Sequence, residues 1–213
     1  RNIGRILKAL KETGRDGNTL IMFLSDNGGD GRTNNAPLRG RKGMFTEGGI
    51  RVPFIAVMPG VIPAGVKSDV MIHVIDFYPT LAEFAGAALP APSAQPLDGV
   101  SLVPLLLGRA SSLRRSAIYY HFPGYLDTRA SPCSVILREL EGHRYKLFYF
   151  YEDRHTELYD LTSDIGEQTD LLSFPPAGDF KKVYRIEAQL VGELRLWLKK
   201  TGAIYPIDPE TGK

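Results

Sequence analysis

The sequence lacks several features that would assign it to a class of protein. It has one cysteine, Cys133, among 213 residues, so an internal disulfide is excluded. No apolar run is long enough to cross a bilayer, and the amino end has no signal-peptide pattern, so we expect no membrane partner. There is no long basic run either, because 26 Lys and Arg are scattered among 24 Asp and Glu and the net charge is +2. This balance gives no argument for a nucleic-acid partner.

The composition is that of a folded protein with a substantial core. Hydrophobic residues make up 43% of the chain, which suffices for one large core or for one core plus a small subdomain. Arg1 to Thr13 predicts a helix that Gly14 ends, with apolar side chains at helical spacing: Ile3, Ile6, Leu7 and Leu10. A chain that opens inside such a helix is expected to be cut from something longer, with any targeting segment before Arg1.

The first half predicts an α/β arrangement. Thr19 to Leu24 is a continuous apolar run, which suits a central strand buried on both faces, as in parallel α/β sheets. The polar cluster Ser25-Asp26-Asn27-Gly28-Gly29 follows at the carboxyl end of this strand, the edge at which open α/β sheets bind ligands. Ile50 to Met58 predicts a second buried strand.

Helices and a proline-rich connection follow these strands. Asp76 to Gly86 predicts a helix with Pro79 in its first turn, and Ser101 to Leu107 predicts a short one. Between them, Leu89 to Asp98, which includes Pro92, predicts an extended surface connection.

The second half differs in character. Asp179 to Lys200 predicts a long amphipathic helix, and Tyr205 to Lys213 is expected to be a loosely held tail. Short strands rich in aromatic and β-branched residues precede the helix: Ala117 to Phe122, Ser134 to Leu137, Tyr145 to Tyr151 and Glu157 to Leu161. Strands followed by one helix predict an α+β subdomain with an antiparallel sheet, so we expect two domains, 1–112 and 113–213.

Asp26 and Asn27 are the candidate metal ligands. They supply a carboxylate and a carboxamide oxygen on adjacent residues, and calcium and magnesium take oxygen ligands of this kind. Asp-Asn-Gly is also a common turn signal, so on these residues alone both interpretations stay open. Asp30 is either a further ligand or a solvated loop acid.

Lys42 is the candidate anion-binding residue. It lies 16 positions after Asp26, in a loop rich in arginine and glycine, where backbone can approach a ligand and an ammonium can meet an oxyanion. A solvated surface lysine is the alternative, and Arg39 and Arg41 are open to the same two interpretations. Arg51 is predicted to form a structural ion pair with Glu47.

Several blocks occur together in one order between Thr19 and about Lys200. They are Asp26-Asn27-Gly28, Asn35-x-Pro37-Leu38-Arg39-Gly40-x-Lys42, Glu47-Gly48-Gly49-Ile50-Arg51-Val52-Pro53, Asp76-Phe77-Tyr78-Pro79-Thr80-Leu81, Leu97-Asp98-Gly99-Val100-Ser101-Leu102 and Glu157-Leu158-Tyr159-Asp160-Leu161 with the acidic loop after it. In these blocks the chain resembles the sulfatase family, the arylsulfatase-like branch of the alkaline phosphatase superfamily.

This resemblance implies part of an alkaline phosphatase-like α/β/α sandwich followed by the small α+β subdomain. Asp26 and Asn27 match the family's second pair of calcium ligands, with magnesium as the alternative ion. Lys42 matches the catalytic lysine that contacts the sulfate ester. The family nucleophile is a formylglycine made within a Cys/Ser-x-Pro/Ala-x-Arg motif in the amino-terminal half, which this chain does not contain.

Cys133 does not replace that nucleophile. Val135 stands two positions after it instead of proline or alanine, and Leu137 stands four after it instead of arginine. We therefore predict that Cys133 is a packing residue.

The histidines differ in interest. His121 lies in a segment that resembles a segment of related sulfatases, which in those proteins approaches the substrate pocket. Two roles are open for His121: contact with the leaving group, or a structural role at a strand end. His73 is predicted to be structural, and His143 and His155 to be exposed.

The resemblance predicts the carboxyl-terminal portion of a calcium-dependent sulfatase acting on a sulfated small molecule or a sulfated carbohydrate. The alternatives are a phosphomonoester or phosphonate monoester hydrolase of the same superfamily, and an inactive fragment or non-enzymatic binding piece. Because members of this family are commonly exported, the resemblance implies a periplasmic or secreted protein. An incomplete sheet would leave an apolar edge, so self-association is a further expectation.

Overall fold

The computed structural model describes residues 2–91, 96–176 and 178–206 and divides into two compact units. The first unit contains Arg1–Ser25 and Pro53–Arg115, and the second contains Asp26–Val52 and Ser116–Lys213. Residues 26–52 therefore pack with the later part of the chain, although they precede the domain boundary expected at residue 112. Pro92 and the tail from residue 207 lie outside the described residues.

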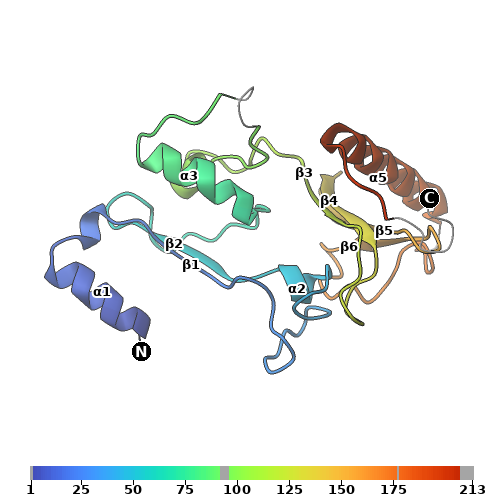
Figure 1. Cartoon of the computed structure of the whole chain (residues 1–213), viewed down its shortest axis with the longest axis horizontal. Coiled ribbons are helices and arrows are strands. Elements are labelled where there is room, and N and C mark those ends of the chain that lie inside the picture. Colours follow the sequence, from blue (N-terminus) through green and yellow to red (C-terminus); the bar gives the residue numbers. More distant parts are fainter. Residues whose placement is uncertain (1, 92–95, 177, 207–213) are drawn as a thin grey trace. The chain divides into compact units, whose positions relative to one another are not determined.

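The first unit begins with α1 (Asn2–Glu12), the short 3-10 helix η1 (Asp16–Asn18) and β1 (Ile21–Leu24) (Figure 1). The prediction of a buried strand in a parallel sheet is wrong for this chain, because β1 pairs antiparallel with β2 (Phe54–Val57). Phe23 is 46% exposed and Ile55 is 55% exposed. In the part of the chain that the structure describes, this sheet has two strands. Phe54 on β2 stacks on Phe77 of α3 with ring centroids 5.3 Å apart, while Ile55 and Val57 on the other side of β2 are exposed.

The second predicted strand also starts later than expected. Glu47–Ile50 forms the short helix α2, and β2 begins only at Phe54. Pro53 has no N–H to donate to a ladder, so it marks the start of the strand.

Two of the family-like blocks interlock around Asp76 in the first unit. Helix α3 (Phe77–Phe84) follows the 3-10 helix η2 (Val74–Asp76), and α4 (Val103–Leu106) comes later. The buried Asp76 carboxylate accepts from the Val100 N–H at 3.0 Å and pairs with Arg115. The Thr80 hydroxyl accepts from the Leu102 N–H at 2.8 Å. These contacts join the two blocks within the first unit.

His73 is structural, as predicted. It caps η2, where its Nδ1 accepts from the Ile75 N–H at 3.3 Å and its own N–H donates to Asp76 at 2.8 Å. Burial lowers the pKa of His73, which favours the neutral ring that can accept at Nδ1.

The second unit contains the predicted antiparallel sheet and long helix (Figure 1). The sheet order is β3-β4-β5-β6, and its strands are β3 (Ala117–Phe122), β4 (Cys133–Leu140), β5 (His143–Phe150) and β6 (Thr156–Asp160). Helix α5 (Phe180–Thr201) lies against β4 and β5 and ends at Gly202, whose φ of +64° suits glycine.

The main core lies between this sheet and α5. The helix contributes one stripe at spacings of three and four residues, and the sheet contributes the facing side chains. They are Val183, Ile186, Leu190, Leu194 and Leu198 from α5, with Ala117, Ile136, Tyr145, Leu147 and Leu158 from the strands.

Cys133 is buried at the start of β4, and burial raises the pKa of its thiol to about 12. Its predicted role as a packing residue is therefore confirmed. As for the membrane, none of the helices in the described residues combines the length and apolar character needed to span a bilayer.

Candidate functional site

The Asp26 and Asn27 side chains lie next to each other on the loop that follows β1. Asp26 is exposed and Asn27 is half-buried. The Asn27 Nδ2 donates to the Asp26 Oδ2 at 2.7 Å, which aligns the two side chains. A carboxylate and a carboxamide thus present hard oxygen donors on one short segment.

These two residues fit part of a calcium site. Calcium takes about six to eight oxygen ligands, more than two side chains supply. Among the described residues, no cluster of three or more His, Cys, Asp or Glu is placed to hold a metal. The donor chemistry therefore suits a shared site that takes further ligands from other segments. Asp30 is exposed and accepts from the Arg32 N–H at 3.3 Å, which is the behaviour of a loop acid.

The structure brings the Lys42 loop to the Asp26 loop. The Lys42 N–H donates to the Gly29 carbonyl at 2.9 Å, and the Lys42 side chain is exposed to solvent. Asn35 joins the two loops a second time. Its Oδ1 accepts from the Gly29 N–H at 3.1 Å, and its Nδ2 donates to the carbonyls of Gly29 and Gly40 at 3.2 and 3.1 Å.

Five glycines form a tightly packed support for these loops, which we call the glycine platform: Gly28, Gly29, Gly40, Gly48 and Gly49. The Gly28 N–H donates to the Gly49 carbonyl at 2.9 Å, and the Gly48 N–H donates to the Arg39 carbonyl at 2.7 Å. A Cβ on Gly28 would lie 1.7 Å from the Gly48 carbonyl oxygen, and one on Gly49 would lie 2.0 Å from that of Met44. Only glycine permits such close backbone contact.

The β3–β4 side of the sheet also supports the Lys42 loop. The Phe45 ring packs against those of Tyr120 and Phe122, with centroids 5.8 and 5.7 Å apart. In the connection between β3 and β4, the Arg129 Nη1 donates to the Lys42 carbonyl at 3.4 Å. Aromatic packing and a backbone contact therefore both hold this loop.

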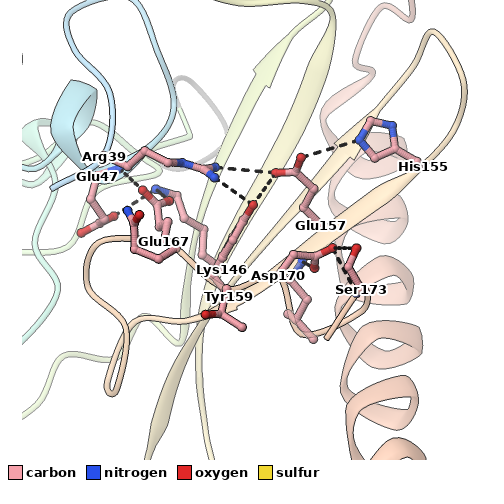
Figure 2. Close-up of polar contacts among 12 residues, drawn as sticks. Arg39, Glu47, Lys146, His155, Glu157, Tyr159, Glu167, Asp170 and Ser173 are labelled. Atoms are coloured by element: carbon pink, nitrogen blue, oxygen red, sulfur yellow. Dashed lines mark hydrogen bonds and ion pairs between the residues drawn. The ribbon is translucent and has the colours of Figure 1, made fainter. Parts of the chain in front are cut away.

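A buried group of charges surrounds Glu47, the residue before Gly48 of the glycine platform (Figure 2). Lys146 on β5 has an exposure of 0%, and its Nζ lies 3.0 Å from the Glu47 Oε1 and 2.8 Å from the Glu167 Oε1. The Glu167 Oε2 accepts from the Glu47 N–H at 2.7 Å. Arg51 lies 3.4 Å from the other Glu47 oxygen, so the predicted Glu47–Arg51 ion pair is confirmed. Burial raises the pKa of Glu167, and Lys146 opposes this shift.

Arg39 is an anchor to the sheet, not a solvated surface cation. Its Nη1 donates to the Tyr159 hydroxyl at 3.0 Å, and its guanidinium lies 4.8 Å from the centroid of that ring. The Tyr159 hydroxyl donates in turn to Glu157 at 2.8 Å (Figure 2). Arg41 is exposed.

Both ring nitrogens of His121 contact groups of this chain. Nδ1 lies 2.8 Å from the Ser134 Oγ, and Nε2 lies 2.8 Å from the Ile204 carbonyl oxygen. This geometry supports the structural alternative for His121. His143 bonds to Asp160 at 2.7 Å, and the exposed His155 bonds to Asp153.

Asn35, Lys146 and Glu167 are the residues of this site that sequence reasoning missed. The sequence does contain a signal for Lys146, because it is the one charged residue in the run Tyr145–Phe150. A charged side chain in a buried strand needs a buried partner of opposite charge. Glu167 lies in the acidic loop that followed the last family-like block, and Asn35 lies in the block that contains Lys42.

Comparisons with known proteins agree with the sequence blocks. Residues 40–194 match the family described as N-sulphoglucosamine sulphohydrolase, C-terminal. A sulfatase of Formosa agariphila is 45% identical over 95% of this chain and 38% of its own length. Human arylsulfatase A is 32% identical over 80% of this chain and 36% of its own.

Solved structures show the same relationship. The structure of BT4656 in complex with its substrate D-glucosamine-2-N,6-O-disulfate matches with a TM-score of 0.72 and 28% identity, over 100% of this chain and 40% of that one. The α/β fold class is thereby confirmed. The chain spans less than half the length of each of these relatives. The chain belongs to the sulfatase family and corresponds to its carboxyl-terminal portion.

Proposed function

We propose that this chain forms one wall of the active site of a sulfuric ester hydrolase. In this proposal Asp26 and Asn27 are calcium ligands and Lys42 contacts the sulfate. The observation that carries it is the bond between the Lys42 N–H and the Gly29 carbonyl, which joins the candidate metal-binding loop to the candidate anion-binding loop. Family membership supports the assignment of both roles: the family model covers Lys42, and the match to the Formosa sulfatase extends over 95% of the chain.

In this proposal, the residues of this chain stabilise negative charge on the sulfate group, and the nucleophile lies elsewhere. When bound, calcium supplies positive charge that offsets the charge developing on the sulfate group. Asp26 and Asn27 hold it, and the exposed Lys42 ammonium places a second positive charge on the same group. Preorganised charge of this kind is usually the largest catalytic contribution, worth on the order of 100- to 1000-fold in rate per donor.

The nucleophile of the proposal is a formylglycine outside these residues. The printed sequence contains no Cys/Ser-x-Pro/Ala-x-Arg motif. Cys133 does not match this motif. It is also a poor nucleophile, because it is buried and burial raises the pKa of its thiol to about 12. We therefore propose that the 213 residues alone are inactive and that activity belongs to a longer sulfatase.

The substrate class in this proposal is a sulfate monoester on a carbohydrate or on another small molecule. BT4656 was solved with a sulfated glucosamine, which favours the carbohydrate. The likeness to arylsulfatase A keeps the smaller aryl esters as the second class. Because members of the family are commonly exported, we also propose a periplasmic or secreted location.

Parallel hydrolysis assays test this function. The intact protein is given an aryl sulfate, the aryl phosphate and aryl phosphonate with the same leaving group, and D-glucosamine-2-N,6-O-disulfate. The proposal predicts that both sulfates are hydrolysed faster than the phosphate and the phosphonate. Preferred hydrolysis of either phosphorus ester would select the phosphomonoester or phosphonate hydrolase instead. Release of sulfate by the 213-residue chain alone would contradict the external nucleophile.

A further inference from the structure

Three buried ionisable side chains, Glu47, Lys146 and Glu167, form what we call the buried charge triad. Lys146 and Glu167 are each 0% exposed and Glu47 is 3% exposed. The triad joins α2, β5 and the loop after β6, which are far apart in the sequence. Its charges are balanced in part by Arg51, at 3.4 Å from Glu47.

Stability alone is a weak reason for such a group. Removing charges from water is costly, and well-packed apolar side chains often replace a buried ion pair without loss of stability. Buried ionic groups do, however, fix one arrangement of the segments they join, because any shift leaves a charge without its partner. The question is therefore which segment the triad fixes.

The contacts lead from the triad to α2. The Glu167 Oε2 accepts from the Glu47 N–H at 2.7 Å, and the Glu47 carboxylate is paired with Lys146 at 3.0 Å. Both the backbone and the side chain of Glu47 are thus held. Glu47 is the first residue of α2, so the position of the helix follows from these contacts.

From α2 the contacts lead to both candidate site loops. The Gly48 N–H donates to the Arg39 carbonyl, three residues before Lys42. The Gly49 carbonyl accepts from the Gly28 N–H, directly after Asn27. These contacts are between backbones, because the atoms nearest to a Cβ on Gly28, Gly48 or Gly49 are backbone atoms. A displacement of α2 is therefore transmitted to both loops.

We propose that Glu167 and Lys146 are positioning residues, which clamp α2 and thereby set the separation between the Asp26–Asn27 pair and Lys42. For catalysis this rests on the proposed function, whereas the clamp itself is a property of the chain. Glu167 acts through the Glu47 N–H and Lys146 through the Glu47 carboxylate. Neither touches the substrate in this proposal.

Two substitutions at Glu167 isolate the clamp. Glu167→Gln and Glu167→Met remove the same charge and have similar unbranched side chains, and both leave Lys146 paired with Glu47. Only glutamine keeps an oxygen that accepts from the Glu47 N–H. Glu167→Ala is a second variant without an acceptor, in case methionine disturbs the packing. Arg138→Met, which breaks the ion pair to Glu193 between β4 and α5, is the control for general destabilisation.

Hydrogen–deuterium exchange of the intact protein is the measurement, followed by mass spectrometry of peptides that cover 26–52 and 133–150. Losing one buried hydrogen bond is expected to raise exchange in 26–52 roughly tenfold in Glu167→Met and Glu167→Ala. The 133–150 peptides should stay within about twofold of the wild type. Glu167→Gln keeps the acceptor for the Glu47 N–H but turns its NH2 group toward the Lys146 Nζ, so its exchange in 26–52 should rise clearly less than in Glu167→Met. Arg138→Met should leave 26–52 unchanged.

The clamp is contradicted if Glu167→Gln and Glu167→Met raise the exchange rate in 26–52 by the same factor. It is also contradicted if Glu167→Met raises the exchange rate in 133–150 as much as in 26–52. Activity separates this proposal from the function. If the wild type hydrolyses no sulfate ester and the exchange pattern holds, the function fails and the clamp stands. If the wild type is an active sulfatase, Glu167→Met should lower kcat about tenfold or more, and Glu167→Gln should lower it clearly less. Equal kcat in these two variants would overturn the positioning role.

Discussion

Asn35 shows how much of this site depends on one amide side chain. It makes contacts at 3.1, 3.2 and 3.1 Å that join the backbone of Gly29 to that of Gly40. We predict that Asn35→Ala lowers the free energy of unfolding by about 1–3 kcal/mol, because backbone groups lose their partners. Asn34→Ala is the matched control, since Asn34 is exposed and its Oδ1 accepts from the nearby Ala36 N–H, and it should cost less. Urea unfolding of the two variants measures the difference, and equal costs would contradict the role of Asn35.

Cys133 gives a second prediction at the residue scale. Burial is the main cause that raises the pKa of its thiol to about 12, and Glu157 adds to the shift. The thiol therefore stays protonated at pH 8, and since the thiolate is the reactive form, iodoacetamide should label the native protein very slowly. Full labelling in denaturant is the control. Rapid labelling of the folded protein at pH 8 would show that Cys133 is neither buried nor protonated.

At this scale the sequence predicts local partners better than distant ones. The Glu47–Arg51 pair was predictable because the two residues are four positions apart. The contacts of Glu47 with Lys146 and Glu167 span 99 and 120 positions, so no local pattern indicates them. The roles of Asp26, Asn27 and Lys42 come from the family resemblance and stay predictions.

At the scale of the element, the glycine platform explains where the secondary structure departs from expectation. Apolar periodicity predicts α5 and the strands of its sheet, because those elements bury one face. It does not predict α2, where Gly48 and Gly49 are required by close backbone contacts and not by their propensity for a helix or a strand. The burial of β1 depends on neighbouring layers, which a local pattern does not reveal.

Two glycine substitutions compare a packed with an unpacked position. Gly49→Ala should lower the free energy of unfolding by about 1–3 kcal/mol or more, because its Cβ would lie 2.0 Å from the Met44 carbonyl oxygen. Gly192→Ala lies within α5 with nothing within 4 Å of the added Cβ, so it should raise stability by about 0.5–1 kcal/mol. Thermal and urea unfolding report both effects. A neutral Gly49→Ala would mean that the platform tolerates a side chain.

At the scale of the whole molecule, the chain carries two candidate site loops and exposes apolar side chains of one sheet. The chain spans 38% of the Formosa sulfatase, and the printed sequence has no nucleophile motif. In the two-stranded sheet, Phe23, Ile55 and Val57 are each more than 40% exposed. Exposed apolar strands invite pairing with another chain.

We therefore predict that the isolated 213-residue chain self-associates. Light scattering after size-exclusion chromatography should show a mass above that of a monomer and rising with concentration. Ile55→Lys places a charge on the exposed side of β2 and should shift the chain toward monomer. A monodisperse wild-type monomer at all concentrations would count against this expectation.

The central claim is that Asp26 with Asn27, and Lys42, have separate roles in one site, and bound calcium tests it most directly. The intact protein and its Asp26→Ala and Lys42→Ala variants are dialysed against one calcium concentration, and the metal per protein is measured together with sulfatase activity. Asp26→Ala should lose calcium and activity together. Lys42→Ala should keep its calcium while activity falls on the order of 100- to 1000-fold. Equal calcium loss in the two variants, or full calcium in Asp26→Ala, would contradict the account.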